Sequence, residues 1–364
     1  MTSPTDFDSQ KLRIDELCQN LKSLELANDV LLAKQRAQLL GESDVYRWFV
    51  AEEYGGFGWD TEQILLGYLE LSKACLSSAF VLTQRSGAVK RISTSGNSRL
   101  KQSMLPDLAA GNIFSTVGIS HLTTSRRHLG KPVLQAEKVD DGYILDGFSP
   151  WVTGVTFADS VIVGACLVDH PDPELNDAQI LINVSTDLKG VSRPDPAQLV
   201  ALTDSCTGQI RLDKVFVEED QLVDGPVPNV MNQGSGGSTG GLQTSTLAIG
   251  LSKAAIDYIE QESQVRDGIS LPLSHLQDQW QATYEYLFSV AKGENNCTNE
   301  QLRIQSNSLV LRSTQAALMV AKGVGYCKGH PVGRWCQEAL FFLVWSCPQA
   351  VADSNLCELA QVTD

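Results

Sequence analysis

Trp151 and Thr153, two residues apart, are candidates for binding a flat aromatic ring. They lie in the stretch 141–159, DGYILDGFSPWVTGVTFAD, which predicts a hairpin: a strand, a turn at Asp146-Gly147, and a second strand ending at Thr153. Side chains two residues apart on a strand point to the same face. An indole and a hydroxyl on one face could stack on a flat ring and hydrogen-bond to its edge. The alternative is that Trp151 fills the core and Thr153 is an ordinary strand residue.

The chain before this stretch predicts an N-terminal α-helical domain over residues 1–112. Apolar residues at helical spacing predict helices over 11–40, 63–77, 78–92 and 100–110. The glycines of 55–58 interrupt them and predict a tight turn. Asp60 or Thr61 can cap the helix that follows the turn, and Gly111 can end the last one.

Residues 113–224 predict a β domain. Short β-rich runs alternate there with Gly, Pro, Asn and Asp, at 114–119, 133–139, 143–145, 160–167, 178–183 and 208–217. Turn signals at this spacing predict a small antiparallel barrel or sandwich.

Residues 225–241 are rich in Gly and Ser and predict a linker. Helical patterns then return over 242–266, 276–292, 300–322 and 332–359. The last part, 242–364, therefore predicts a four-helix bundle, and the whole chain an α+β fold that is mostly α.

Composition narrows the class of partner. The 364 residues are 43% hydrophobic and carry a net charge of −15, which argues against nucleic acid or an anionic membrane surface. No apolar run approaches the roughly 20 residues of a membrane span, and no secretory signal is expected. The 9 cysteines are scattered and predict reduced thiols in a cytoplasmic protein. The 5 histidines lack metal-site spacing.

Four segments stand out in order along the chain: 53–58, 105–111, 142–153 and 211–217, the last followed by Glu218. They resemble, in turn, EEYGGxG, LPxLxxG, a hairpin ending in W-I-T, and FxxVxVP with Glu218 in the place of the proline. These motifs, together with the order of helices, β domain and helical bundle, resemble the acyl-CoA dehydrogenase superfamily, and the resemblance runs from about residue 44 to the C-terminus.

The resemblance implies a flavoprotein that binds FAD between the β domain and the bundle. It implies α,β-dehydrogenation of an acyl-CoA thioester with hydride transfer to FAD, in a homodimer or homotetramer. Trp151 would pack on the isoalloxazine and the Thr153 hydroxyl would bond near N5. Ser120 and His121 would contact the pyrimidine end of the flavin. Arg266 is the residue retained from an inter-subunit flavin motif.

The sequence departs from the family at the catalytic base. The family places a carboxylate in one of two positions, which Ser346 and Gln243 occupy here. Neither side chain can take a proton unassisted at neutral pH, and losing a general base costs about 10²–10⁴ in rate. Glu338 is the nearest acid along the chain, either a substitute base or a structural ion pair.

Two further questions stay open at this level. Arg126 and Arg127 replace the family's phosphate loop, either as a clamp for a phosphate or as part of a solvated loop. The altered site also leaves three functions: a dehydrogenase with a divergent site, a flavin monooxygenase of the same fold, or a non-catalytic scaffold.

Overall fold

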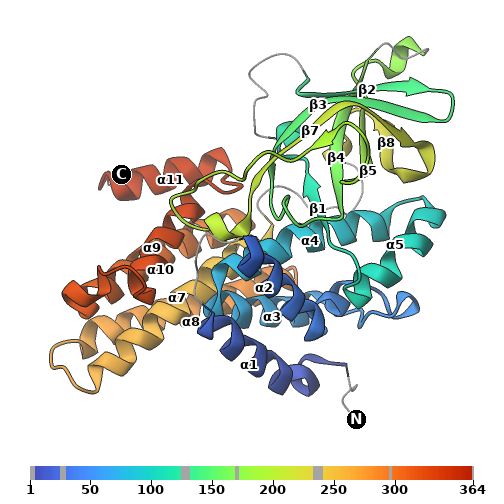
Figure 1. Cartoon of the computed structure of the whole chain (residues 1–364). Helices are drawn as coiled ribbons and strands as arrows, with labels where there is room; N and C mark the ends of the chain where they lie inside the picture. The colour runs from blue at the N-terminus through green and yellow to red at the C-terminus, as the bar shows by residue number, and fades with distance from the viewer. Residues whose placement is uncertain are drawn as a thin grey trace.

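The computed structural model describes residues 5–24, 30–123, 132–168, 172–232, 241–294 and 297–362. In Figure 1 a β-sheet lies over two helical layers, with α4 and α5 beneath it and the C-terminal helices extending to the left. The fold is mostly helical with one mixed sheet.

The N-terminal part is helical, as predicted. Its helices are α1 (Phe7–Ser23), α2 (Val30–Glu42), α3 (Thr61–Ala74), α4 (Leu76–Thr94) and α5 (Ser98–Ala110), with the 3₁₀ turns η1 (Val45–Phe49) and η2 (Glu52–Tyr54). The segment predicted as one helical stretch, 11–40, therefore forms two helices.

Local signals placed several boundaries of these helices correctly. Asp60 caps α3 through a reciprocal capping box with Gln63. Gly111 ends α5 in the left-handed conformation. The glycine turn is tight because a Cβ on Gly56 would lie 1.8 Å from the Val50 carbonyl oxygen.

The sheet has eight strands: β1 (Ser115–Gly118), β2 (Leu134–Val139), β3 (Gly142–Val152), β4 (Ser160–Val168), β5 (Gln179–Ser185), β6 (Val191–Ser192), β7 (Gly208–Glu218) and β8 (Leu222–Val227). Their order is β6-β7-β3-β2-β4-β5-β8, and β1 pairs with β4.

The prediction of an antiparallel barrel needs correction. β1 and β2 both pair with β4 in parallel, one after the other along its length, so the sheet is mixed. Among the described residues no pairing joins the end strands β6 and β8, so the sheet is not closed. Short β-rich runs between turn residues predicted the strands, but such runs carry no information on the direction of the strands.

The predicted hairpin within 143–153 is also wrong. These residues form the single strand β3, and Gly147 sits at a β-bulge with φ of 127° rather than in a turn. A Cβ there would lie 2.2 Å from the Val133 carbonyl oxygen, which explains the glycine. The hairpin is the one between β2 and β3, which turns at Asp140-Asp141.

The C-terminal part is helical, with α7 (Leu242–Ser263), α8 (Ser270–Ala291), α9 (Asn299–Gly325), α10 (Pro331–Ala339), η8 (Leu340–Leu343) and α11 (Gln349–Leu359). The predicted last helix, 332–359, is thus broken at η8 and Pro348. The predicted linker is partly structured, because β8 runs to Val227 and η7 covers Val230–Asn232. Residues 233–240 lie outside the described ranges.

Candidate functional site

The ends of β1 and β3 meet at one place in the sheet. A Cβ on Gly118 would lie 2.9 Å from the Ser149 Oγ and 3.0 Å from the Val152 Cγ2. The short helix α6 (Ser120–Thr123) follows β1 directly and packs against β3 and β4. The fold therefore brings the segment of Ser120 and His121 next to the segment of Trp151 and Thr153.

Trp151 and Thr153 differ sharply in exposure. The Trp151 side chain is 49% exposed, so the alternative that it fills the core is wrong. Thr153 is only 4% exposed. β3 ends at Val152, so Thr153 no longer follows the alternation of the strand. Of the two side chains, only the Trp151 indole is accessible at the surface.

The Thr153 hydroxyl belongs to a buried chain of hydroxyl groups. Thr153 Oγ1 shares a hydrogen bond with Thr207 Oγ1 at 3.0 Å, and Thr207 Oγ1 shares another with Ser205 Oγ at 2.8 Å. A hydroxyl has one donor and two acceptor positions. Thr153 thus keeps a free hydrogen-bonding position on its hydroxyl, and the chain fixes the orientation of that hydroxyl.

His121 makes a structural hydrogen bond. Its Nε2 lies 2.7 Å from the Gly164 carbonyl oxygen, and because a carbonyl only accepts, Nε2 carries the proton. Gly164 lies on β4 between the residues paired with β1 and those paired with β2. His121 thus supplies a hydrogen bond to the Gly164 carbonyl group, at a point where β4 pairs with neither β1 nor β2. Burial lowers the pKa of His121, so the ring is neutral at pH 7.

Arg266 lies just beyond α7 and contacts α9. Its Nη1 donates to the Val320 carbonyl oxygen, and its Nη2 forms an ion pair with Glu262 at 2.9 Å. The guanidinium therefore ties the end of α7 to α9 within one chain. Its contact with the flavin of a second chain stays a prediction.

The two base positions lie on different elements. Gln243 is the second residue of α7 and is exposed. Ser346 follows η8, is half-buried, and has a φ of 45°. This left-handed conformation is uncommon for a residue other than glycine and costs about 1–3 kcal/mol. The segment around Ser346 must therefore be held by its surroundings.

Aromatic rings and a buried cation hold this segment. Phe341 and Trp345 stack at 5.1 Å, and Phe80 of α4 packs edge-on against both, at 4.8 and 5.0 Å. Arg303, only 1% exposed, donates from Nη2 to the carbonyl oxygens of Trp345 at 2.9 Å and Phe342 at 3.3 Å. Burial lowers its pKa to about 10, so it stays charged at neutral pH.

Glu338 makes a structural ion pair. It is 2% exposed, and its Oε1 lies 3.5 Å from the Nε of Arg334, one helical turn earlier on α10. Burial raises its pKa to about 8, with Arg334 opposing the shift. Its buried contact with Arg334 fits the structural alternative, and its role as a substitute base stays a prediction.

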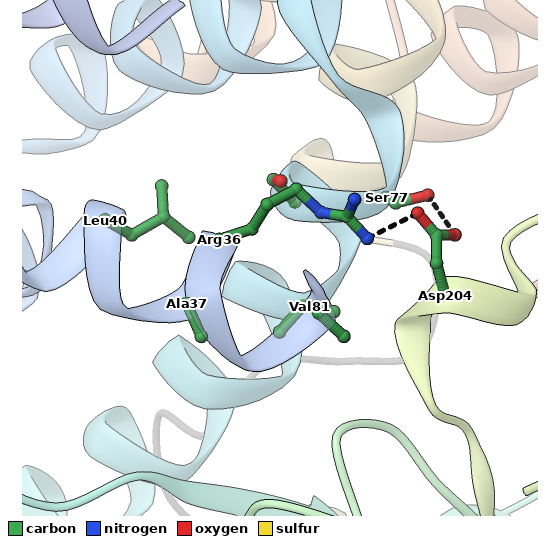
Figure 2. A pocket seen from close by; sticks show the side chains of 8 residues that line it. Arg36, Ala37, Leu40, Ser77, Val81 and Asp204 are labelled. Atoms are coloured by element: carbon green, nitrogen blue, oxygen red, sulfur yellow. Dashed lines mark hydrogen bonds and ion pairs between the residues drawn. The ribbon is translucent and has the colours of Figure 1, made fainter. Parts of the chain in front are cut away.

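A second buried cluster went unnoticed in the sequence. Arg36 of α2 and Ser77 of α4 both contact the carboxylate of Asp204 in η5 (Thr203–Ser205), as Figure 2 shows. They border a cavity of about 10 Å³, which has room for about one water molecule and none for a substrate. Arg36 and Asp204 are 168 positions apart. No local signal in the sequence distinguishes Arg36 or Asp204 from a surface residue, since polar residues lie beside both.

Metal sites and membrane-spanning helices are not found in the described part of the chain. No group of three or more His, Cys, Asp and Glu side chains there could hold a metal ion. None of the helices in the described ranges is long and apolar enough to cross a membrane. Arg126 and Arg127 lie outside the described residues.

Comparisons with known proteins agree with this architecture. Residues 16–112 match the family model "Acyl-CoA dehydrogenase, N-terminal domain". A probable acyl-CoA dehydrogenase, YngJ of Bacillus subtilis, is 25% identical over 79% of this chain and 79% of its own length. The isovaleryl-CoA dehydrogenase of Arabidopsis thaliana mitochondria is also 25% identical, over 84% of this chain and 78% of its own.

Solved structures share the fold along nearly the whole chain. A glutaryl-coenzyme A dehydrogenase with bound glutaryl-CoA superposes with a TM-score of 0.79 at 16% identity, over 97% of this chain and 95% of that one. An acyl-CoA dehydrogenase of Bacillus anthracis complexed with FAD has a TM-score of 0.77 at 15% identity, over 97% of this chain and 69% of that one. At such identities the likeness concerns the fold.

Proposed function

This chain belongs to the acyl-CoA dehydrogenase superfamily, and from that premise we propose that it is a flavin-dependent oxidoreductase that binds FAD and an acyl-CoA thioester. The observation that carries the proposal is the pairing, at the end of β3, of the half-exposed Trp151 indole with the Thr153 hydroxyl, which Thr207 orients. Relatives that act on acyl-CoA substrates and a structural neighbour complexed with FAD support it.

The residues fit one face of a flavin. The Trp151 indole would cover the isoalloxazine, and the Thr153 hydroxyl would bond to its edge, held at the correct angle by Thr207. Gly118 lets β1 approach β3 closely, since a Cβ there would crowd Ser149 and Val152. Bound FAD would supply the acceptor for the hydride that leaves the substrate.

The chain's own contribution to proton transfer is weak. A base must lie within hydrogen-bond reach of the proton that it removes. Ser346 and Gln243 hold the two family positions for a base, and neither side chain accepts a proton at neutral pH. Glu338 is enclosed in the core and paired with Arg334. We therefore propose a dehydrogenase site with an intact frame around Ser346 and a low intrinsic rate.

The absorbance spectrum of the purified protein tests this proposal. We expect bound or added FAD to give a flavin spectrum that bleaches slowly with an acyl-CoA under anaerobic conditions. A colourless protein that ignores FAD and FMN would instead be a scaffold. A flavoprotein that ignores acyl-CoA and hydroxylates a substrate with O₂ and reduced flavin would be a monooxygenase.

We also propose a cytoplasmic homodimer or homotetramer with no nucleic-acid partner. Large apolar side chains are exposed near the ends of α7 and α9, at Val265, Met319, Val324 and Tyr326, and a second copy of the chain would cover them. All 9 cysteines are free thiols, which suits a reducing compartment. Light scattering after size-exclusion chromatography tests the oligomer, and a monomeric mass would contradict it.

A further inference from the structure

The turn η5 is held in a strained conformation. The residues on either side of it, Leu202 and Cys206, have φ of 61° and 51°, in the left-handed region that favours glycine. Each such residue costs about 1–3 kcal/mol and persists only where the surrounding structure fixes it. Contacts from outside the turn must therefore stabilise η5.

Those contacts come from the N-terminal helices and converge on Asp204. Its Oδ2 accepts a hydrogen bond from the Arg36 Nη2 at 2.5 Å, and its Oδ1 accepts one from the Ser77 Oγ at 2.7 Å (Figure 2). All three side chains are buried. A buried carboxylate with two directional donors is fixed in position and fixes the turn that carries it.

The turn in its place holds the chain directly after β3. The Gly154 N–H donates to the Ser205 carbonyl oxygen at 2.9 Å, and the Val155 N–H donates to the Cys206 carbonyl oxygen at 3.2 Å. The hydroxyl chain from Ser205 through Thr207 reaches Thr153. Since β3 ends at Val152, these bonds replace the sheet as the support of residues 153–155.

We propose that Arg36 and Ser77 are positioning residues for Thr153 and act on it through Asp204 and η5. This inference rests on the proposed function, in which the Thr153 hydroxyl faces the flavin. The N-terminal helices thereby set the orientation of a hydroxyl in the β domain, although neither Arg36 nor Ser77 lies next to Thr153.

The energetics of a buried ion pair determine which variants of Arg36 and Asp204 test this role. Replacing both partners of a buried ion pair by apolar residues is often neutral for stability, whereas removing one partner is strongly destabilising. The double variant Arg36→Met/Asp204→Leu therefore keeps the core filled while it removes the anchor of η5. Arg36→Lys retains the charge and serves as the conservative variant.

The control is an ion pair that joins helices away from η5. Lys73 of α3 contacts Asp257 of α7 at 2.5 Å, so Lys73→Met removes a link between helices without touching the β domain. Two measurements are compared across the variants: hydrogen exchange of the Gly154 and Val155 amides by mass spectrometry, and the affinity and midpoint potential of FAD.

In the double variant we expect exchange at the two amides to become about tenfold faster and the Kd for FAD to rise about tenfold, the loss of roughly one hydrogen bond. The FAD midpoint potential should shift as well. Arg36→Lys should recover most of the wild-type values, and Lys73→Met should retain them. If the double variant fails to fold, Ser77→Ala should give a smaller change in the same direction.

Unchanged exchange at Gly154 and Val155 would overturn the proposed anchoring, whatever the flavin does. Faster exchange with wild-type FAD affinity and potential would overturn the link to the cofactor. A wild-type protein that binds no FAD would overturn the proposed function and the role of Thr153 with it, and the exchange data, which need no flavin, separate that failure from a failure of the anchor.

Discussion

The end of β3 and the segment around Ser346 are both firmly supported, yet they differ in what they present. At the end of β3 the Trp151 indole is half exposed, and the Thr153 hydroxyl is buried and held by Thr207. The Ser346 segment has an equally elaborate frame, with stacked rings and the buried Arg303 bound to two of its carbonyl groups. What it presents is a neutral serine. We predict from the family resemblance that Ser346 stands where relatives carry a carboxylate base.

Introducing a carboxylate at position 346 should have the largest effect on the difference between the two regions. Ser346→Glu should raise the rate of acyl-CoA-dependent flavin reduction by about 10²–10⁴ because it supplies a carboxylate base where the frame is intact. The matched control is Ser346→Gln, which has the same size and no basic group. Anaerobic stopped-flow absorbance measures the rate.

Equal rates in the two Ser346 variants would show that the position no longer faces the substrate. Gln243→Glu then tests the second base position in the same assay. If only Gln243→Glu raises the rate of flavin reduction, the proton is removed near the start of α7.

The pH dependence of the free energy of unfolding tests whether Glu338 has a structural role in the core. Its pKa of about 8 lies above the ordinary 4.5, so between these values the native state binds more protons than the unfolded chain. Its contribution to stability is therefore complete below about pH 4.5 and is lost as the pH rises through 8, with a slope of up to about 1.4 kcal/mol per pH unit.

Glu338→Gln should remove this slope, so the free energy of unfolding of the variant should gain on that of the wild type between pH 5 and pH 8. Urea titrations at several pH values measure the difference. Placed in the Ser346→Glu background, the same change should leave flavin reduction intact. If the double variant Ser346→Glu/Glu338→Gln reduced the flavin more slowly than Ser346→Glu, Glu338 would take part in the reaction.

Substitution of Trp151 tests the proposed contact between the end of β3 and the flavin. Trp151→Ala should weaken FAD binding by about 1–3 kcal/mol, or roughly 5- to 150-fold in Kd, if the indole stacks on the ring as aromatic side chains stack on nucleic-acid bases. Trp151→Phe should retain most of the affinity. Because the side chain is half exposed, the free energy of unfolding without FAD should hardly change, and equilibrium titration with FAD separates the two effects.

The sequence anticipated features that depend on neighbouring residues. The Asp60 cap, the Gly111 helix end and the glycine turn at 55–58 are local, since each needs only a few consecutive residues and their backbone preferences. The motif order also indicated the family correctly. Gly147 shows the limit of such signals, because a glycine with positive φ serves a turn or a bulge equally well.

The sequence alone was enough to predict the succession of helices, strands and helices, and it shows that the two predicted base positions carry Ser346 and Gln243 rather than a carboxylate. The tertiary structure decided the direction of strand pairing, the unequal exposure of Trp151 and Thr153, and the contact of Arg36 with Asp204. The reason is physical. Propensity and capping act over a few residues, whereas burial and ion pairing depend on groups that only folding brings within a few ångströms of each other.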